Sequence, residues 1–190
     1  MNTRIALLAA GLLAGCAGQA AWRSDTARMP VNADGGPKLS ESEAITLASW
    51  ALKDPANTAG NPERAARAIA AEDWLAGQDM LTGQFDGYAP IDQAAWSNFR
   101  REAREAIGVA PDAPSQVVVD HLFAAADALS AGQAGAATAQ LADPIFSLGP
   151  QRTLAALTNL PPLQGRAWAF ADLARNDDRS TGTPKGIINF

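Results

Sequence analysis

Few side chains in this sequence are of the types that carry out covalent chemistry. The one histidine, His121, follows Asp120 inside a pattern typical of a helix. Adjacent helical residues point in different directions, so this pair is not a catalytic dyad. The positions three and four residues on either side of His121 hold only valine and alanine, which offer a base or ligand no local partner. The motifs GxSxG and SxxK, which would present a serine nucleophile, do not occur. His121 is therefore predicted to be a structural residue.

Paired carboxylates are the chemistry that the sequence excludes least, because acids from different helices can meet across a cleft. A hydrolase of this kind needs two acids about 5–10 Å apart. Phosphate-binding glycine motifs are absent, and Asp177 and Asp178 lack the spacing of a calcium loop. The sequence thus predicts no catalytic residue, no metal ligand and no cofactor.

The only cysteine, Cys16, ends the run Leu13-Ala14-Gly15-Cys16. Behind Arg4, residues 5–13 are apolar apart from Gly11, a stretch too short to span a membrane but typical of a signal peptide. The run resembles the lipobox of bacterial lipoproteins. The resemblance implies cleavage between Gly15 and Cys16 and acylation of the Cys16 thiol by fatty acids such as palmitate.

The same resemblance implies a location. Each buried methylene of an acyl chain contributes about 0.8 kcal/mol, so two or three chains hold a protein at the membrane practically permanently. Ala17 follows the cysteine, where an aspartate commonly retains such proteins in the inner membrane. The expected location is the periplasmic face of the outer membrane.

Charge and hydropathy narrow the classes of partner. The formal net charge is −5 at pH 7, and no cluster of basic residues offers a surface for phosphates, so nucleic acid is not an expected partner. After residue 16 no apolar run approaches the roughly 20 residues of a membrane-spanning helix. We expect contact with the membrane through the acylated Cys16.

Composition divides the chain into four parts. Residues 1–15 are the expected signal peptide, and residues 16–38 the lipidated cysteine with a flexible tether rich in small and polar residues. Residues 39–175 are predicted to form one helical domain, and residues 176–190 a turn-rich tail.

The domain shows helical periodicity and no sustained alternation, which predicts an all-α fold of six or seven helices packed as an irregular bundle of hairpins. The expected helices run from the Ser40 capping box to a stop at Asp54-Pro55, from the Asn61 cap to Gly83, from the Asp92 cap to Gly108, and over about 114–131, 133–141, 150–159 and 163–175. The expected aromatic core is Trp50, Trp74, Trp96, Phe99, Phe123 and Trp168.

One helix face and one loop are candidates for an interaction surface. Arg100, Arg101 and Arg104 lie with two glutamates opposite the apolar stripe of the third helix, a pattern typical of a solvated face. Phe85 and Tyr88 lie on the preceding loop, and aromatic residues are enriched at protein interfaces.

These observations predict a lipid-anchored helical protein of the bacterial envelope that binds an unidentified envelope protein as an accessory or scaffolding subunit. Two alternatives remain open. A cell-wall hydrolase predicts a deep cleft with two acids, and a carrier of a small ligand or lipid predicts a closed apolar pocket above about 300 Å³.

Overall fold

In the computed structural model the chain is all-α over the residues that the structure describes, 25–82 and 90–164. No strand occurs in these two ranges. The helices are α1 Glu41–Ala51, α2 Pro62–Thr82, α3 Pro90–Ala106, α4 Ser115–Ser130, α5 Ala134–Gln140 and α6 Pro150–Thr158, with a 3-10 helix, η2, at Pro55–Asn57. The all-α fold class and six of the predicted helices are confirmed. Apart from Leu163 and Gln164, the predicted helix over 163–175 and the tail over 176–190 lie outside the described residues.

The helix boundaries follow the local chemistry of the sequence with one exception. Ser40 forms the predicted capping box with Glu43, and Asn61 Oδ1 accepts a hydrogen bond from the Arg64 amide at 2.9 Å. Helix α3 begins at Pro90, so the prediction that Asp92 caps it is wrong. Proline is favoured in the first turn of a helix because its missing amide would have no partner there. Gly108 follows the end of α3 with φ of 73°, a conformation that strains other residues.

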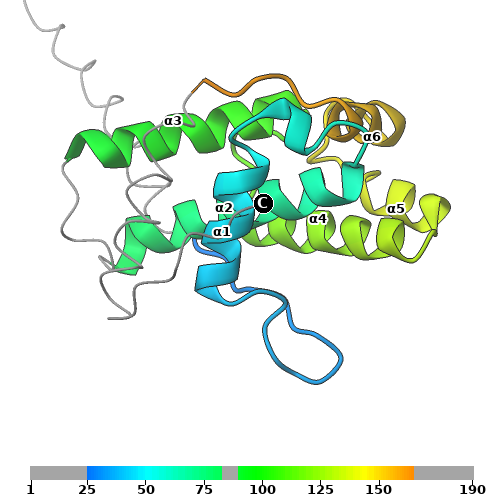
Figure 1. The fold of residues 1–190 in the computed structure, drawn as a ribbon, viewed down its shortest axis with the longest axis horizontal. Coiled ribbons are helices and arrows are strands. Elements are labelled where there is room, and N and C mark those ends of the chain that lie inside the picture. The colour runs from blue at the N-terminus through cyan, green and yellow to red at the C-terminus, as the bar shows by residue number, and fades with distance from the viewer. Residues whose placement is uncertain (1–24, 83–89, 165–190) are drawn as a thin grey trace, which may run out of the picture.

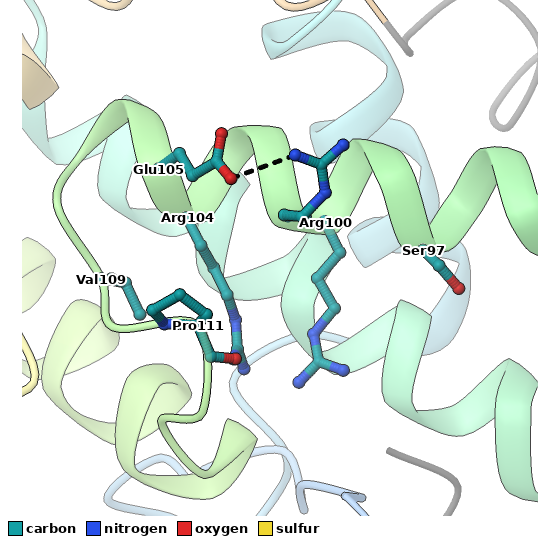
Figure 2. Close-up of a pocket in the computed structure, with 7 residues that line it drawn as sticks. Ser97, Arg100, Arg104, Glu105, Val109 and Pro111 are labelled. Carbon is teal, nitrogen blue, oxygen red and sulfur yellow. Dashed lines mark hydrogen bonds and ion pairs between the residues drawn. The ribbon is translucent and has the colours of Figure 1, made fainter. Parts of the chain in front are cut away.

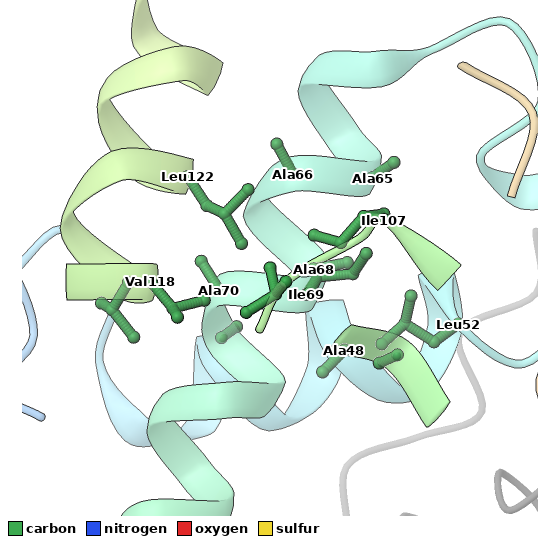
Figure 3. Packing of buried hydrophobic residues seen from close by; sticks show 14 of the residues in the cluster. Ala48, Leu52, Ala65, Ala66, Ala68, Ile69, Ala70, Ile107, Val118 and Leu122 are labelled. Atoms are coloured by element: carbon green, nitrogen blue, oxygen red, sulfur yellow. The ribbon is translucent and has the colours of Figure 1, made fainter. Parts of the chain in front are cut away.

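Helix α2 is the central element, in contact with α1, α3, α4 and α6 (Figure 1). Its buried face consists largely of alanines together with Ile69 and Leu75. Short side chains let neighbouring helices approach closely. Figure 3 shows Val118 and Leu122 of α4 on one flank of α2, with Leu52 and Ile107 on the other. Both flanks of α2 therefore belong to one core.

The aromatic core is partly as predicted. Trp96, Phe99 and Phe123 are buried, and Trp74 is half-buried against the core. Trp50 is 42% exposed and lies beneath the Arg64 guanidinium, 5.1 Å from the ring centroid, so its assignment to the core is wrong. Trp168 lies outside the described residues.

Residues 25–38, predicted as part of the flexible tether, lie against the helices at both ends. Asp25 contacts α3 and α4, Ala27 is buried, and Lys38 Nζ lies 2.5 Å from Asp127 of α4. Between these contacts the loop around residues 31–37 projects from the helical body (Figure 1). The predicted start of the domain at residue 39 is therefore too late, and Asp25 already belongs to it.

Among the helices in the described part of the chain, none combines the length and the apolar character that crossing a bilayer requires.

Candidate functional site

The most unusual feature of the interior is a group of four acidic and basic side chains and one serine between α2, α3 and α4. Asp73 of α2 and Ser115 of α4 are 0% exposed, and Arg100 and Arg104 of α3 are 7% and 4% exposed. Asp25, from the segment before α1, completes the group. We call these five residues the buried charged cluster. Charged side chains are almost never this deeply buried unless they are paired.

Asp73 is the centre of the buried charged cluster. Arg104 donates to both of its carboxylate oxygens, from Nε at 2.6 Å and from Nη2 at 2.9 Å, which is the bidentate geometry of a strong pair. Arg100 Nε donates to Asp73 Oδ1 at 3.2 Å, and Ser115 Oγ donates to the same oxygen at 2.5 Å. Arg104 Nη1 also donates to the Ala113 carbonyl at 2.8 Å. The arginines thus find their partners inside the protein.

Asp25 joins the buried charged cluster from its solvent side. Its Oδ2 accepts from Arg100 Nη2 at 2.6 Å, and its Oδ1 accepts from the backbone amide of Ser115 at 2.7 Å. That amide is in the first turn of α4, where backbone amides lack intrahelical partners. Partial burial acts to raise the pKa of Asp25, but the hydrogen bonds from Ser115 and Arg100 and the charge of both arginines outweigh it and lower that pKa.

Glu72, next to Asp73 on α2, is the exception to this pairing. Its side chain is fully buried, and neither carboxyl oxygen has a hydrogen-bond partner. Burial, assisted by the negative charge of Asp73, raises the pKa of Glu72 well above its ordinary value, although Arg100 and Arg104 oppose the shift. The raised pKa favours the neutral form of Glu72, beside which two carboxylates and two guanidinium groups of the cluster balance in charge.

A cavity of about 230 Å³ lies beside α3, on the side of the helix from which the two buried arginines depart. Figure 2 shows Arg100 and Arg104 extending away from Glu105, with Val109 and Pro111 at one end of the cavity. Ser97 and Arg101 complete the lining. Since the guanidinium groups of Arg100 and Arg104 are occupied elsewhere, these residues offer the cavity mainly their aliphatic stems.

The structure separates the arginines that the sequence groups together. Arg100 and Arg104 are buried, so their placement on a solvated face is wrong. Arg101 is on the exposed side of α3, where it pairs with Glu105 at 3.1 Å, and its part in an interaction surface remains a prediction. The other predicted sites lie outside the described residues. They are Gly15 and Cys16, for processing and lipidation, and Phe85 and Tyr88, for interaction.

The spacing of the sequence does contain a signal for the burial of these charges. Arg100 and Arg104 follow Trp96 by four and eight residues, which places all three on one face of α3. Asp73 likewise follows Ile69 by four residues and lies within the apolar stripe of α2. Charges of opposite sign within two apolar stripes indicate a buried pair.

His121 has partners that its own helix does not provide. Its Nδ1 lies 3.2 Å from Gln140 Oε1, and its Nε2 lies 3.3 Å from Asp143 Oδ2. Its ring meets Phe146 edge to face, with ring centroids 6.3 Å apart. These contacts join α4 to α5 and to the turn after α5, in keeping with a structural role. Among the side chains that the structure describes, in residues 25–77 and 96–164, no group of three histidine, cysteine or acidic residues is placed to hold a metal ion.

The described part of the chain is an all-α domain whose helices are joined by a buried network of ion pairs. No protein family model, no curated protein and no solved structure matches the chain.

Proposed function

We propose that the protein is a lipid-anchored helical protein of the bacterial envelope, held at the periplasmic face of the outer membrane, and that it acts by binding a protein partner as an accessory or scaffolding subunit. The observation that carries the proposal is the run Leu13-Ala14-Gly15-Cys16 behind a short apolar stretch. A lone cysteine in an exported chain needs an explanation, and acylation supplies one.

The surface around the cavity beside α3 supports a binding role. Val109, Pro111 and the stems of two arginines give it an apolar floor, and the exposed Arg101–Glu105 pair lies at its rim. An apolar centre with a polar rim is the arrangement typical of protein interfaces. The cavity is smaller than the pocket of about 300 Å³ that the carrier alternative needs. Its lining includes one acid, Glu105, whereas the hydrolase alternative needs two.

The lipid anchor is tested with the full chain expressed in a bacterium that is fed an alkyne-labelled fatty acid. The parent should incorporate the label and sediment with membranes, and Cys16→Ala should do neither. The variant Ala17→Asp is the matched control, because it keeps the cysteine and is expected to change only the choice of membrane. Equal labelling of the parent and Cys16→Ala would refute the anchor.

The binding role is tested by crosslinking in the native envelope followed by mass spectrometry. We expect a stoichiometric protein partner that Arg101→Glu, or Phe85→Ala with Tyr88→Ala, removes. Arg152→Glu changes the charge of an exposed residue on α6 and should retain that partner. Recovery of peptidoglycan or lipid without a protein partner would overturn the binding role in favour of the hydrolase or the carrier.

A further inference from the structure

Residues 25–28 are bound by three helices in the manner of a docked peptide. The carboxylate of Asp25 accepts from Arg100 and from the Ser115 amide, at 2.6 Å and 2.7 Å. The backbone of Arg28 makes two hydrogen bonds to one side chain, since its N–H donates to Gln116 Oε1 at 2.7 Å and its C=O accepts from Gln116 Nε2 at 3.2 Å. Ala27, between these contacts, is 1% exposed. We call residues 25–28 the N-terminal clamp.

Helix α2 is shaped to admit the N-terminal clamp. A Cβ added at Gly77 would lie 2.9 Å from the Asp25 carbonyl oxygen and 3.5 Å from Thr26 Cα. Both atoms belong to the backbone, which cannot give way as the end of a flexible side chain can. The absence of a side chain at position 77 therefore allows the segment to lie directly on α2.

The position of the N-terminal clamp limits the length of chain between the domain and Cys16. Eight residues, 17–24, separate Cys16 from Asp25, and a fully extended chain of that length spans about 30 Å. If the domain began at residue 39, as composition suggests, the limit would be about 80 Å. The clamp more than halves this reach.

We propose that the N-terminal clamp holds the domain close to the lipid bilayer, with the end of the domain that carries the start of α4 turned toward the membrane surface. The inference rests on the proposed acylation of Cys16. The partner of this face is a lipid surface, and the domain is oriented because its chain leaves from Asp25, beside the first turn of α4. The far end of α4, at Ser130, lies about 24 Å further along the helix axis.

The first experiment measures how often the N-terminal clamp opens, in the absence of a membrane. The purified full chain in detergent is digested with trypsin, and cleavage after Arg28 is followed by mass spectrometry. Asp25→Ala with Gln116→Ala should accelerate this cleavage at least about tenfold, because proteolysis of a segment that opens locally follows the population of the open form. Loss of a charge-assisted hydrogen bond is sufficient for a change of that size. Gly77→Ala should have the same effect without removing a charge.

The control for this digestion is Asp34→Ala, in the projecting loop, where Asp34 Oδ1 accepts only a local hydrogen bond from the Gly36 amide at 3.2 Å. It should leave cleavage after Arg28 unchanged. Circular dichroism shows whether each variant keeps its helices. Equal cleavage of the parent, Gly77→Ala and the Asp25 variant, with helices intact, would overturn the clamp whether or not Cys16 is acylated.

The second experiment measures the distance to the membrane. The acylated protein is reconstituted into phosphatidylcholine vesicles that contain a headgroup-labelled energy acceptor, and a donor dye is attached at Asp112→Cys or Ser130→Cys. Both positions are exposed, one before the start of α4 and the other at its end. In the protein without Gly77→Ala, energy transfer to the headgroup acceptor should be greater from the dye at position 112 than from the dye at position 130. In Gly77→Ala, transfer from both positions should fall and become similar.

The outcomes separate the two proposals. Failure of the parent to associate with vesicles would overturn the lipid anchor while the digestion result still stands. Association with equal transfer from positions 112 and 130, together with a protected Arg28, would overturn the orientation of the domain while leaving the anchor in place.

Discussion

The segment at residues 25–38 is held at its two ends by ion pairs that differ mainly in their exposure to solvent. At one end Asp25 joins Arg100, Arg104 and Asp73 in the interior. At the other end Lys38 pairs with Asp127 at 2.5 Å, and Arg67 of α2 bridges Asp127 and Glu63 at 2.9 Å each. The contrast lies in the partner carboxylates: the side chains of Asp127 and Glu63 are 41% and 35% exposed and that of Asp73 is fully buried, while Lys38 and Asp25 themselves are 18% and 24% exposed.

Ion pairs of similar length therefore differ in the free energy that they contribute to folding. An exposed pair is screened by water and contributes between 0 and about 1 kcal/mol. In the interior, removing one partner leaves an uncompensated charge, which costs about 3–5 kcal/mol. The buried charged cluster is therefore expected to control the stability of the domain, while the pairs around Asp127 mainly define where the segment returns to the helices.

The largest effect is expected for Asp73→Ala. This change leaves Arg100 and Arg104 buried with only Asp25, 24% exposed, as a carboxylate partner. We expect the free energy of unfolding to fall by about 3–5 kcal/mol, measured by urea denaturation followed by circular dichroism. Asp112→Ala removes an exposed acid and serves as the control. A loss below about 1 kcal/mol would show that the cluster is no more important than an exposed pair.

The sequence predicts the helices of this domain better than its polar interior. Capping residues and apolar periodicity are local signals, and they place α1, α2, α4, α5 and α6 close to their observed positions. The burial of Arg100 depends on Asp73 and Asp25, which lie 27 and 75 residues away, and their pairing depends on how the helices pack. A run of arginines and glutamates is typical of a solvated face, and the four-residue spacing from Trp96 indicates burial of Arg100 and Arg104 only when it is paired with the position of Asp73 on α2.

The start of the domain likewise depends on contacts that the local sequence does not reveal. Glycine, proline and asparagine in residues 25–38 predict a tether because a short segment of this composition has no periodicity of its own. Its contacts come from the side chains of Arg100 and Gln116, at positions that helical periodicity treats as surface, and from the backbone amide of Ser115.

Glu72 differs from the paired carboxylates, because it is buried beside the cluster without a hydrogen-bond partner. A buried polar group with no hydrogen bond costs about 1–3 kcal/mol. Glu72→Met, which is similar in size and apolar, should therefore raise the free energy of unfolding at pH 7 by about that amount. Urea denaturation of Glu72→Met beside Glu63→Met, a change of a half-exposed glutamate on the same helix that costs only its pair with Arg67, tests this expectation. Destabilisation by Glu72→Met alone would show that the carboxyl group has a favourable role.

Glu72 also gives the stability of the domain a dependence on pH. The pKa of Glu72 is raised in the folded state, so below the ordinary value of 4.5 the group is protonated in both the folded and the unfolded chain. As pH rises above 4.5, the unfolded chain releases this proton first, and stability falls until the folded-state pKa is passed. Asp25 acts in the opposite direction below about 3.8, because its pKa is lowered in the folded state and stability is lost as acid protonates it. Glu72→Gln should remove the decline in the free energy of unfolding above pH 4.5 and leave the loss of stability in acid, which comes from Asp25, in place. A decline above pH 4.5 that Glu72→Gln does not change would contradict the assignment to Glu72.

A small effect is expected at the Lys38 end of the segment, where the ion pair is half-exposed. Lys38→Ala removes the pair with Asp127, but Arg67 remains as a partner of that carboxylate. We expect a loss of at most about 1 kcal/mol, which 1 M salt should reduce because exposed charges are screened. Unfolding at low and high salt measures both quantities. A loss as large as that of Asp73→Ala, insensitive to salt, would remove the distinction between the two ends.

The smallest effect on stability is expected for Arg101→Ala, which tests the comparison within a single helix. Arg101 and Arg104 are neighbours on α3, yet the side chain of Arg101 is 59% exposed and that of Arg104 is 5% exposed. An exposed pair with Glu105 one turn away contributes at most about 0.5 kcal/mol, so the free energy of unfolding should hardly change. Arg104→Ala, measured in parallel, should lose about 3–5 kcal/mol because Asp73 loses its bidentate partner. Arg101 is then free to serve a partner at the rim of the cavity, and loss of that partner without loss of stability would separate binding from folding on the same turn of α3.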